Sequence, residues 1–155
     1  FPVGRLDADS TGLILLTNDG ELANQLTHPR YEVPKTYEVS VKGRLNDADI
    51  EQLQKGLLLA HRTTKGPRVK RAAVSKVQLI THERDETRGD RTRLRVTLQE
   101  GQNREIRRLF ARLGHKVRRL KRTAIGPLTL KGLAVGDWRI LSGAEVNALR
   151  KSARS

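Results

Sequence analysis

The sequence predicts an α+β fold, with a mixed, mainly antiparallel sheet flanked by short helices. Three stretches alternate apolar and polar residues, as half-buried strands do: 35–41, 74–80 and 92–98. Helix signals lie between them, and strand and helix do not alternate regularly, which argues against a doubly wound parallel sheet. A length of 155 residues and no internal repeat favour one domain over 1–155.

The N-terminal third predicts a strand followed by a helix. "GLILLT" (12–17) is a continuous apolar run that ends at the turn "TNDG", so it reads as a buried strand. Residues 19–29 predict a helix, because Asp19 is a suitable N-cap and Pro29 stops it. The strand 35–41 then places Tyr37 on its apolar side.

The middle of the chain predicts a helix, a loop and a hairpin. Asn46 caps a short helix over 46–57, and 60–73 reads as a basic loop with Gly66-Pro67 at its tip. The strands 74–80 and 92–98 are joined by a charged loop and predict a hairpin.

The C-terminal third predicts two further helices. Residues 103–114 carry apolar side chains at helical spacing and end in glycine. A strongly basic, partly extended stretch follows over 115–126. Ser142 and Glu145 then form a capping box at the start of the last helix.

The charge of the chain points to a polyanionic partner. The formal net charge is +14 and the sequence pI is near 11.0, which favours nucleic acid. Disorder is excluded by the clear helix and strand periods. A membrane surface is disfavoured, because the basic residues are not gathered on one long amphipathic helix and no apolar run is long enough to span a bilayer.

The residue types also limit the chemistry and the setting. The chain has no Cys, so we expect an intracellular, cytoplasmic protein without disulfides. Its four His have no ligand spacing on one element, so we expect no metal site. There is no Met and the chain begins with Phe, so we expect it to be an excerpt from which an upstream segment is missing.

Three side chains stand out as candidates for chemistry. Asp7 precedes the first apolar run, where a turn or cap aspartate is the common structural explanation. Arg107 lies at the border of the apolar face of 103–114, where a partly buried guanidinium needs a partner such as Asp7, Asp9 or Glu100. Tyr37 is one of few aromatic residues, and core packing is the usual role of a strand tyrosine. If the protein handles bases, it handles them one at a time and not on a stacking platform.

Three separated motifs give these residues a common setting. They are "GRLDADSTGLILLTNDGELANQLTHP" (4–29), "PKTYEVSVKG" (34–43) and "LQEGQNREIRRLFARLGHKVRRLKRTAIGPLTL" (98–130), and "KGLAVGDWRIL" (131–141) continues the pattern. In this order they span most of the chain. The sequence resembles bacterial ribosomal-RNA pseudouridine synthases of the RsuA type.

The resemblance implies a pseudouridine synthase catalytic fold and roles for four residues. Asp7 falls on the essential aspartate of the family, Tyr37 on the Tyr that stacks on uracil, and Arg107 on the basic residue that pairs with the aspartate. Arg5 falls on an Arg that can fill the space left by the flipped base. The reaction implied is isomerisation of uridine in ribosomal RNA, more in keeping with the large subunit, without cofactor or metal. A monomer is expected.

The partner implied is ribosomal RNA, and 62–71 and 104–122 hold candidate phosphate contacts. Besides Arg5, the RNA-binding candidates are Arg104, Arg108, Arg118, Arg119 and Lys121. Relatives begin with an RNA-binding module that is absent here, so we expect little activity from residues 1–155 by themselves. Two alternatives remain: a non-catalytic RNA-binding or ribosome-assembly protein, and an RNA hydrolase with clustered carboxylates.

Overall fold

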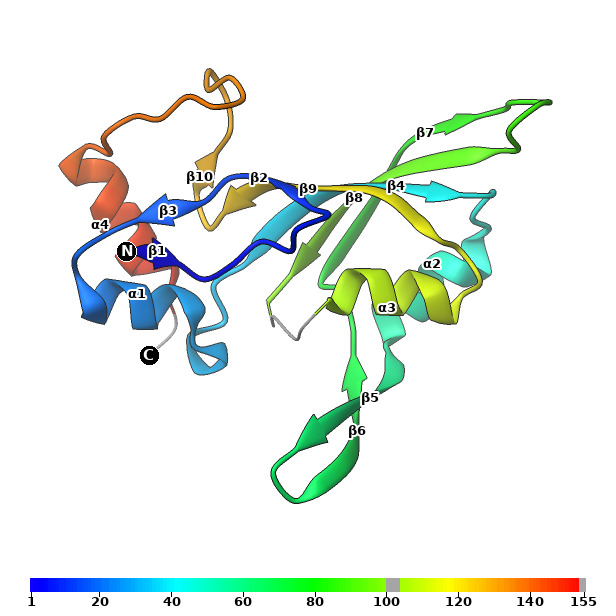
Figure 1. Cartoon of the computed structure of the whole chain (residues 1–155), viewed down its shortest axis with the longest axis horizontal. Helices are drawn as coiled ribbons and strands as arrows, with labels where there is room; N and C mark the ends of the chain where they lie inside the picture. Colours follow the sequence, from blue (N-terminus) through cyan, green and yellow to red (C-terminus); the bar gives the residue numbers. More distant parts are fainter. Residues whose placement is uncertain (100–103, 154–155) are drawn as a thin grey trace.

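The computed structural model describes residues 1–99 and 104–153, and Figure 1 shows their arrangement. Its helices are α1 (Gly20–Thr27), α2 (Asp47–Lys55), α3 (Glu105–Arg112) and α4 (Gly143–Ser152), with a 3-10 turn η1 at Pro29–Tyr31. Its strands are β1 (Pro2–Val3), β2 (Thr11–Gly12), β3 (Leu15–Leu16), β4 (Lys35–Lys42), β5 (Leu57–Thr63), β6 (Gly66–Ala72), β7 (Lys76–Glu83), β8 (Arg91–Leu98), β9 (Val117–Ile125) and β10 (Leu128–Thr129).

A central sheet organises these elements. Its strand order is β10-β9-β4-β8-β7, and all neighbours in this order are antiparallel. Strand β2 adds to β9 in parallel. The predicted α+β class with a mixed, mainly antiparallel sheet and short helices is therefore confirmed.

One face of the sheet is covered by α2 and α3, and the other carries no helix over its central strands (Figure 1). On the covered face, Val39 and Val41 of β4 pack with Leu94 of β8 and with Leu109 and Phe110 of α3. The alternation of apolar and polar residues along β4 and β8 produces this sidedness, because successive side chains point to opposite faces.

A second apolar cluster lies at the other end of the molecule. It joins Leu22 and Leu26 of α1 with Leu149 of α4, Leu15 of β3 and Ile125 of β9. The segment 4–10 runs between this cluster and the one beneath the sheet (Figure 1). This position matters because the candidate aspartate lies on that segment.

The predicted single strand over 12–17 is wrong, because the run divides into β2 and β3. Gly12 has φ +121° and pairs with Arg122 of β9, whereas Leu15 pairs with Val3 of β1. Extended backbone also turns alternate side chains outward, so Leu16 is 73% exposed although the run is apolar throughout.

The predicted basic loop over 60–73 is also wrong, because these residues form most of the β5–β6 hairpin. The turn falls at 64–65, and Pro67 lies within β6 opposite Arg62. A two-stranded hairpin has only edge strands, and edge strands tolerate proline because one side of the ladder is unpaired. Figure 1 shows the hairpin projecting away from the sheet on the side of α3.

The predicted helix caps are confirmed. Asp19 accepts a hydrogen bond from the amide of Leu22, and Ser142 and Glu145 form a reciprocal capping box. Helix α3 is described from Glu105; residue 103 of the predicted range lies outside the described residues. In the part of the chain described, no helix is long and apolar enough to cross a membrane.

The contact between Gly12 and β9 gives a stability prediction. A Cβ at Gly12 would lie 2.2 Å from the carbonyl oxygen of Arg122, which is backbone and cannot move aside. We expect Gly12→Ala to lower the free energy of unfolding by more than about 2 kcal/mol, measured by urea denaturation. Gly66→Ala is the matched control, since Gly66 has φ +109° and nothing within 4 Å. Equal losses for the two variants would refute the steric explanation.

Candidate active site

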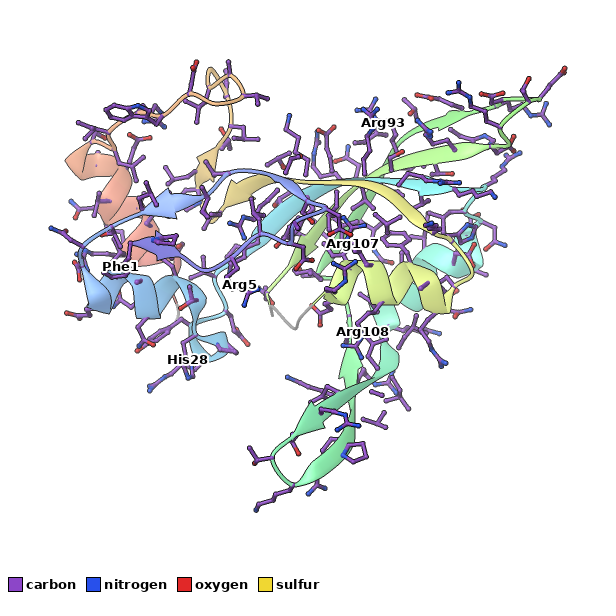
Figure 2. The ribbon with its side chains drawn as sticks, viewed as in Figure 1. Phe1, Arg5, His28, Arg93, Arg107 and Arg108 are labelled. Atoms are coloured by element: carbon purple, nitrogen blue, oxygen red, sulfur yellow. The ribbon has the colours of Figure 1, made fainter. Side chains whose placement is uncertain are left out.

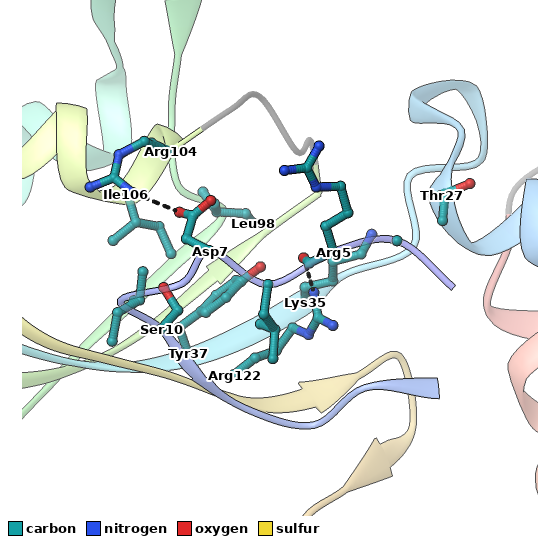
Figure 3. A pocket seen from close by; sticks show the side chains of 13 residues that line it. Arg5, Asp7, Ser10, Thr27, Lys35, Tyr37, Leu98, Arg104, Ile106 and Arg122 are labelled. Atoms are coloured by element: carbon teal, nitrogen blue, oxygen red, sulfur yellow. Dashed lines mark hydrogen bonds and ion pairs between the residues drawn. The ribbon is translucent and has the colours of Figure 1, made fainter. Parts of the chain in front are cut away.

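A pocket of about 460 Å³ lies where the segment 4–10 crosses the covered face of the sheet. Its walls come from that segment, from α1, β4, β8 and β9, and from the start of α3 (Figure 3). The lining residues are Gly4, Arg5, Leu6, Asp7, Ser10, Thr27, Lys35, Tyr37, Leu98, Arg104, Ile106, Leu120 and Arg122. Arg5, Asp7 and Tyr37, which the resemblance places in one site, thus line one cavity together with Arg104, a predicted RNA-binding residue.

Asp7 and Tyr37 lie on neighbouring walls of this pocket (Figure 3). Asp7 opens a turn that is closed by a 2.9 Å hydrogen bond from the amide of Ser10 to its carbonyl oxygen. Asp7 therefore belongs to a turn, as its sequence context suggests, and its carboxylate also lines the pocket. Tyr37 lies on β4, opposite Arg122 of β9 and Val96 of β8, and is partly buried.

Arg104 binds both acids of the loop. Its Nη1 lies 3.5 Å from Oδ2 of Asp7, and its two terminal nitrogens donate to the two carboxylate oxygens of Asp9 at 3.0 Å each. Arg104 itself has left-handed backbone, with φ 54° and ψ 29°, at the N-cap of α3. Such a conformation is uncommon for a residue with a Cβ and is typical of functional sites.

The resemblance implied that Arg107 pairs with Asp7, and the structure differs. Arg107 donates through Nη2 to the carbonyl oxygen of Asp9 at 2.7 Å and to Oγ of Ser10 at 3.3 Å. Its nearest carboxylate is that of Asp9, at 3.5 Å. The side chain is only 13% exposed, as expected at the border of the apolar face, but it lies behind the loop and not in the pocket wall. The third partner considered, Glu100, lies outside the described residues.

The two arginines change the acidity of Asp9. The hydrogen bond from Arg104 holds the pKa of the Asp9 carboxyl below its usual value, and the charge of Arg107 acts in the same direction. Asp9 is therefore ionised at neutral pH and fixes Arg104 next to Asp7. Asp9, considered from sequence as a partner of Arg107, thus pairs mainly with Arg104 and orients it.

Sequence reasoning missed two cations in the pocket wall, one buried and one partly buried. Arg122 is 4% exposed; its Nε donates to the carbonyl of Leu13 at 2.9 Å and its Nη1 contacts that of Arg5 at 3.5 Å. Its Nη2 has no hydrogen-bond partner among the described residues. Two positions after the apolar Leu120, Arg122 falls on the inward side of β9 by strand alternation, a signal that was available in the sequence.

Lys35 is the second of these cations. Its Nζ donates to the carbonyl of Leu26 at 3.1 Å. Burial lowers the pKa of Lys35, and the nearby charge of Arg122 lowers it further. The pocket therefore holds a carboxylate, an aromatic ring and three cationic side chains besides Arg5, an arrangement suited to an anionic, planar ligand.

The other RNA-binding candidates do not converge on this pocket. Arg108 lines a separate hollow between α3 and the β5–β6 hairpin, and Arg118 lines one at the β7–β8 turn. Arg119 and Lys121 line a hollow on the face of the sheet without helices. The basic residues of 104–122 thus line several hollows besides the pocket, and two of these hollows adjoin, since both are lined by Glu83 and Arg91.

The chain belongs to the RNA pseudouridylate synthase family, whose family profile matches residues 1–112. Its fold agrees with this membership. A solved structure described as a crystal structure of pseudouridylate synthase is 32% identical, with a TM-score of 0.77 over 96% of this chain and 58% of that chain.

Two curated relatives carry the same specific name. Ribosomal large subunit pseudouridine synthase B of Bacillus subtilis (strain 168) is 40% identical over 153 residues, which are 99% of this chain and 58% of that protein. The Escherichia coli (strain K12) protein of that name is 42% identical over 150 residues, 96% of this chain and 47% of that protein. The chain therefore spans about half the length of these relatives.

The pairing of Arg104 with Asp9 gives a titration prediction. Because Arg104 is the largest cause of the lowered pKa of Asp9, we expect Arg104→Gln to raise that pKa toward the ordinary value of about 3.9, measured by carboxyl NMR. The ion pair contributes stability above about pH 4 and loses it as the pH falls through the pKa of Asp9. Arg112→Gln, exposed on the same helix, is the control; a pKa that moves equally in both variants would contradict the assignment.

Proposed function

We propose that the pocket converts uridine to pseudouridine in ribosomal RNA, and specifically in large-subunit RNA. The observation that carries this proposal is the convergence of Asp7 and Tyr37 on one pocket in a chain of the RNA pseudouridylate synthase family. The choice of the large subunit rests on the names of the two relatives. The protein is proposed to act in the cytoplasm as a monomer.

The reaction is an isomerisation in which the same atoms are rejoined. The bond between the ribose C1′ and N1 of uracil breaks, the ring turns, and C1′ bonds to C5, which loses its proton while N1 gains one. A target uridine within structured RNA must first leave its stack. A cavity of about 460 Å³ beside the aromatic ring of Tyr37 supplies a place to hold the detached base.

Four lining residues and Arg107, beside the pocket, are assigned roles from their positions. The carboxylate of Asp7 acts on the sugar, either as a nucleophile at C1′ or as a base. Tyr37 stacks on the uracil ring, and Arg5, exposed at the pocket mouth, fills the gap left in the RNA. Arg104 places its positive charge beside Asp7, with Nη1 3.5 Å from Oδ2. Arg107 positions the loop through the backbone of Asp9.

The passive RNA-binding alternative explains the charge but gives no use for a pocket with this carboxylate and ring. The hydrolase alternative lacks its usual apparatus: residues 1–99 and 104–153 contain no group of three or more His, Cys, Asp or Glu side chains placed to hold a metal ion.

Removal of the Asp7 carboxylate tests the chemistry. In the protein that carries this sequence, at its natural length, we expect Asp7→Asn to lower the rate of pseudouridine formation in ribosomal RNA transcripts at least about 100-fold while RNA affinity is retained. Chemical mapping of pseudouridine gives the measurement. Asp9→Asn is the control in the same loop, with a loss of only about tenfold or less. Normal conversion by Asp7→Asn would reject the proposal, and RNA cleavage would favour the hydrolase.

Removal of the Arg107 charge tests the loop. We expect Arg107→Met to leave the fold mostly intact, because the methionine side chain still covers the apolar border, and to abolish most of the activity, because the loop that carries Asp7 loses its contacts. Turnover of bound transcript and thermal unfolding are measured together. Arg112→Met on the exposed side of α3 is the control. Near-normal turnover in Arg107→Met would refute this role.

A further inference from the structure

The face of the sheet without helices carries a hollow that the pocket chemistry does not use. It encloses about 450 Å³ and draws on β4, β7, β8 and β9. The residues that line it are Glu38, Val39, Ser40, Glu83, Arg91, Arg93, Arg119 and Lys121. Figure 2 shows Arg93 on this side of the sheet and Arg107 on the other, so the hollow lies opposite the candidate active site.

The cations of the hollow form two rows. Arg91 and Arg93 alternate along β8 with buried residues, and Arg95 continues this row beyond the hollow; Arg119 and Lys121 lie on β9, two strands away. Side chains at every second position of a strand repeat at roughly 6.6–6.8 Å. Two parallel rows of positive charge with this repeat match a chain of regularly spaced anions better than a single small anion.

Between the rows lies a hydroxyl without a partner. Ser40 of β4 is opposite Arg93 on one side and Arg119 on the other. It is 7% exposed, and its Oγ makes no hydrogen bond to any described residue. A buried hydroxyl that has lost water and found no partner is unusual. Ser40 thus offers a donor that a phosphate oxygen would satisfy, with two guanidinium groups placed to balance the phosphate charge.

The acids of the hollow leave an excess of positive charge. Glu38 is bound by Arg93, whose Nη2 lies 3.2 Å from its Oε1, and Glu83 is the cross-strand neighbour of Arg91. Four cations therefore face two carboxylates within the hollow. Arg95 and Lys42 extend the positive face along their strands.

We propose that this hollow binds the phosphate backbone of ribosomal RNA, as a second contact surface separate from the pocket. RNA is favoured over an acidic protein because the two rows repeat regularly and Ser40 places a hydroxyl between them. The apolar residue of its lining, Val39, packs its side chain into the core cluster with α3 and offers no anchor for a protein. Its role is affinity, independent of base sequence and sensitive to salt. Only the identity of the partner, ribosomal RNA, rests on the proposed function.

The test removes the two arginines that flank Ser40. In the natural-length protein, we expect Arg93→Gln with Arg119→Gln to weaken binding of a large-subunit RNA transcript about tenfold at low salt and to lower the slope of log K against log salt by about 1 to 2. The conversion rate of saturating RNA stays unchanged. Lys131→Gln with Lys151→Gln removes the same charge from exposed positions elsewhere and is the matched control.

Ser40→Ala keeps the test decisive if the double variant folds poorly. Because the hydroxyl of Ser40 is unpaired, its removal leaves the unfolding temperature of the RNA-free protein unchanged or raised, whereas RNA affinity falls about threefold. A loss of affinity equal to that of the lysine control, or no loss in Ser40→Ala, overturns the proposal. So does a double variant that binds RNA normally but loses binding to polyglutamate, which would assign the hollow to an acidic protein.

Binding and conversion are measured separately, so the two proposals can fail independently. If the natural-length protein forms no pseudouridine and its RNA affinity still depends on Arg93, Arg119 and Ser40, the proposed function fails and this inference stands.

Discussion

The candidate active site depends on the close contact between the N-terminal segment and strand β9. Gly12 lies against the backbone of Arg122, and the amide of Leu13 donates to the carbonyl of Arg122 at 2.8 Å. The side chain of Arg122 returns to the carbonyls of Leu13 and Arg5. Both ends of the loop that carries Asp7 are thereby fixed to one strand. Tyr37 of β4 also pairs with Arg122. The Asp7 loop and the Tyr37 ring are therefore both positioned by Arg122.

Positive charge in the site is directed mainly at backbone oxygens. Arg107, Arg122 and Lys35 donate to the carbonyls of Asp9, Leu13 and Leu26 respectively. A carbonyl carries only a partial charge, so these contacts orient the cations without neutralising them. The lowered pKa of Lys35 reflects this, since burial disfavours its charged form and the charge of Arg122 repels it further. The site therefore keeps a positive field that suits an anionic ligand, while Arg104 is paired with Asp7 and Asp9 and Arg107 lies 3.5 Å from the Asp9 carboxylate.

Much of the fold follows from patterns within single elements, and the site does not. Alternation along 35–41 and 92–98 was enough for β4 and β8, and caps such as Asp19 located the helices. The division of 12–17 was not predictable in this way, because it depends on how closely Gly12 approaches a strand more than a hundred residues later. The motifs located Arg5, Asp7 and Tyr37 in one site, but the contacts of Arg107 with Asp9 and Ser10 are set by the loop conformation.

Strand β4 connects the two surfaces on which function is proposed. Its inward residues include Tyr37, which lines the pocket, and Val39, which packs beneath α3; its outward residues Glu38 and Ser40 line the hollow between the rows of cations. A shift of one residue in the pairing of β4 with β8 would exchange the two sets of side chains. The buried valines make that shift costly, because it would turn them toward water. The apolar core thus fixes the register, and the register places the ring of Tyr37 at the pocket and Ser40 on the opposite face.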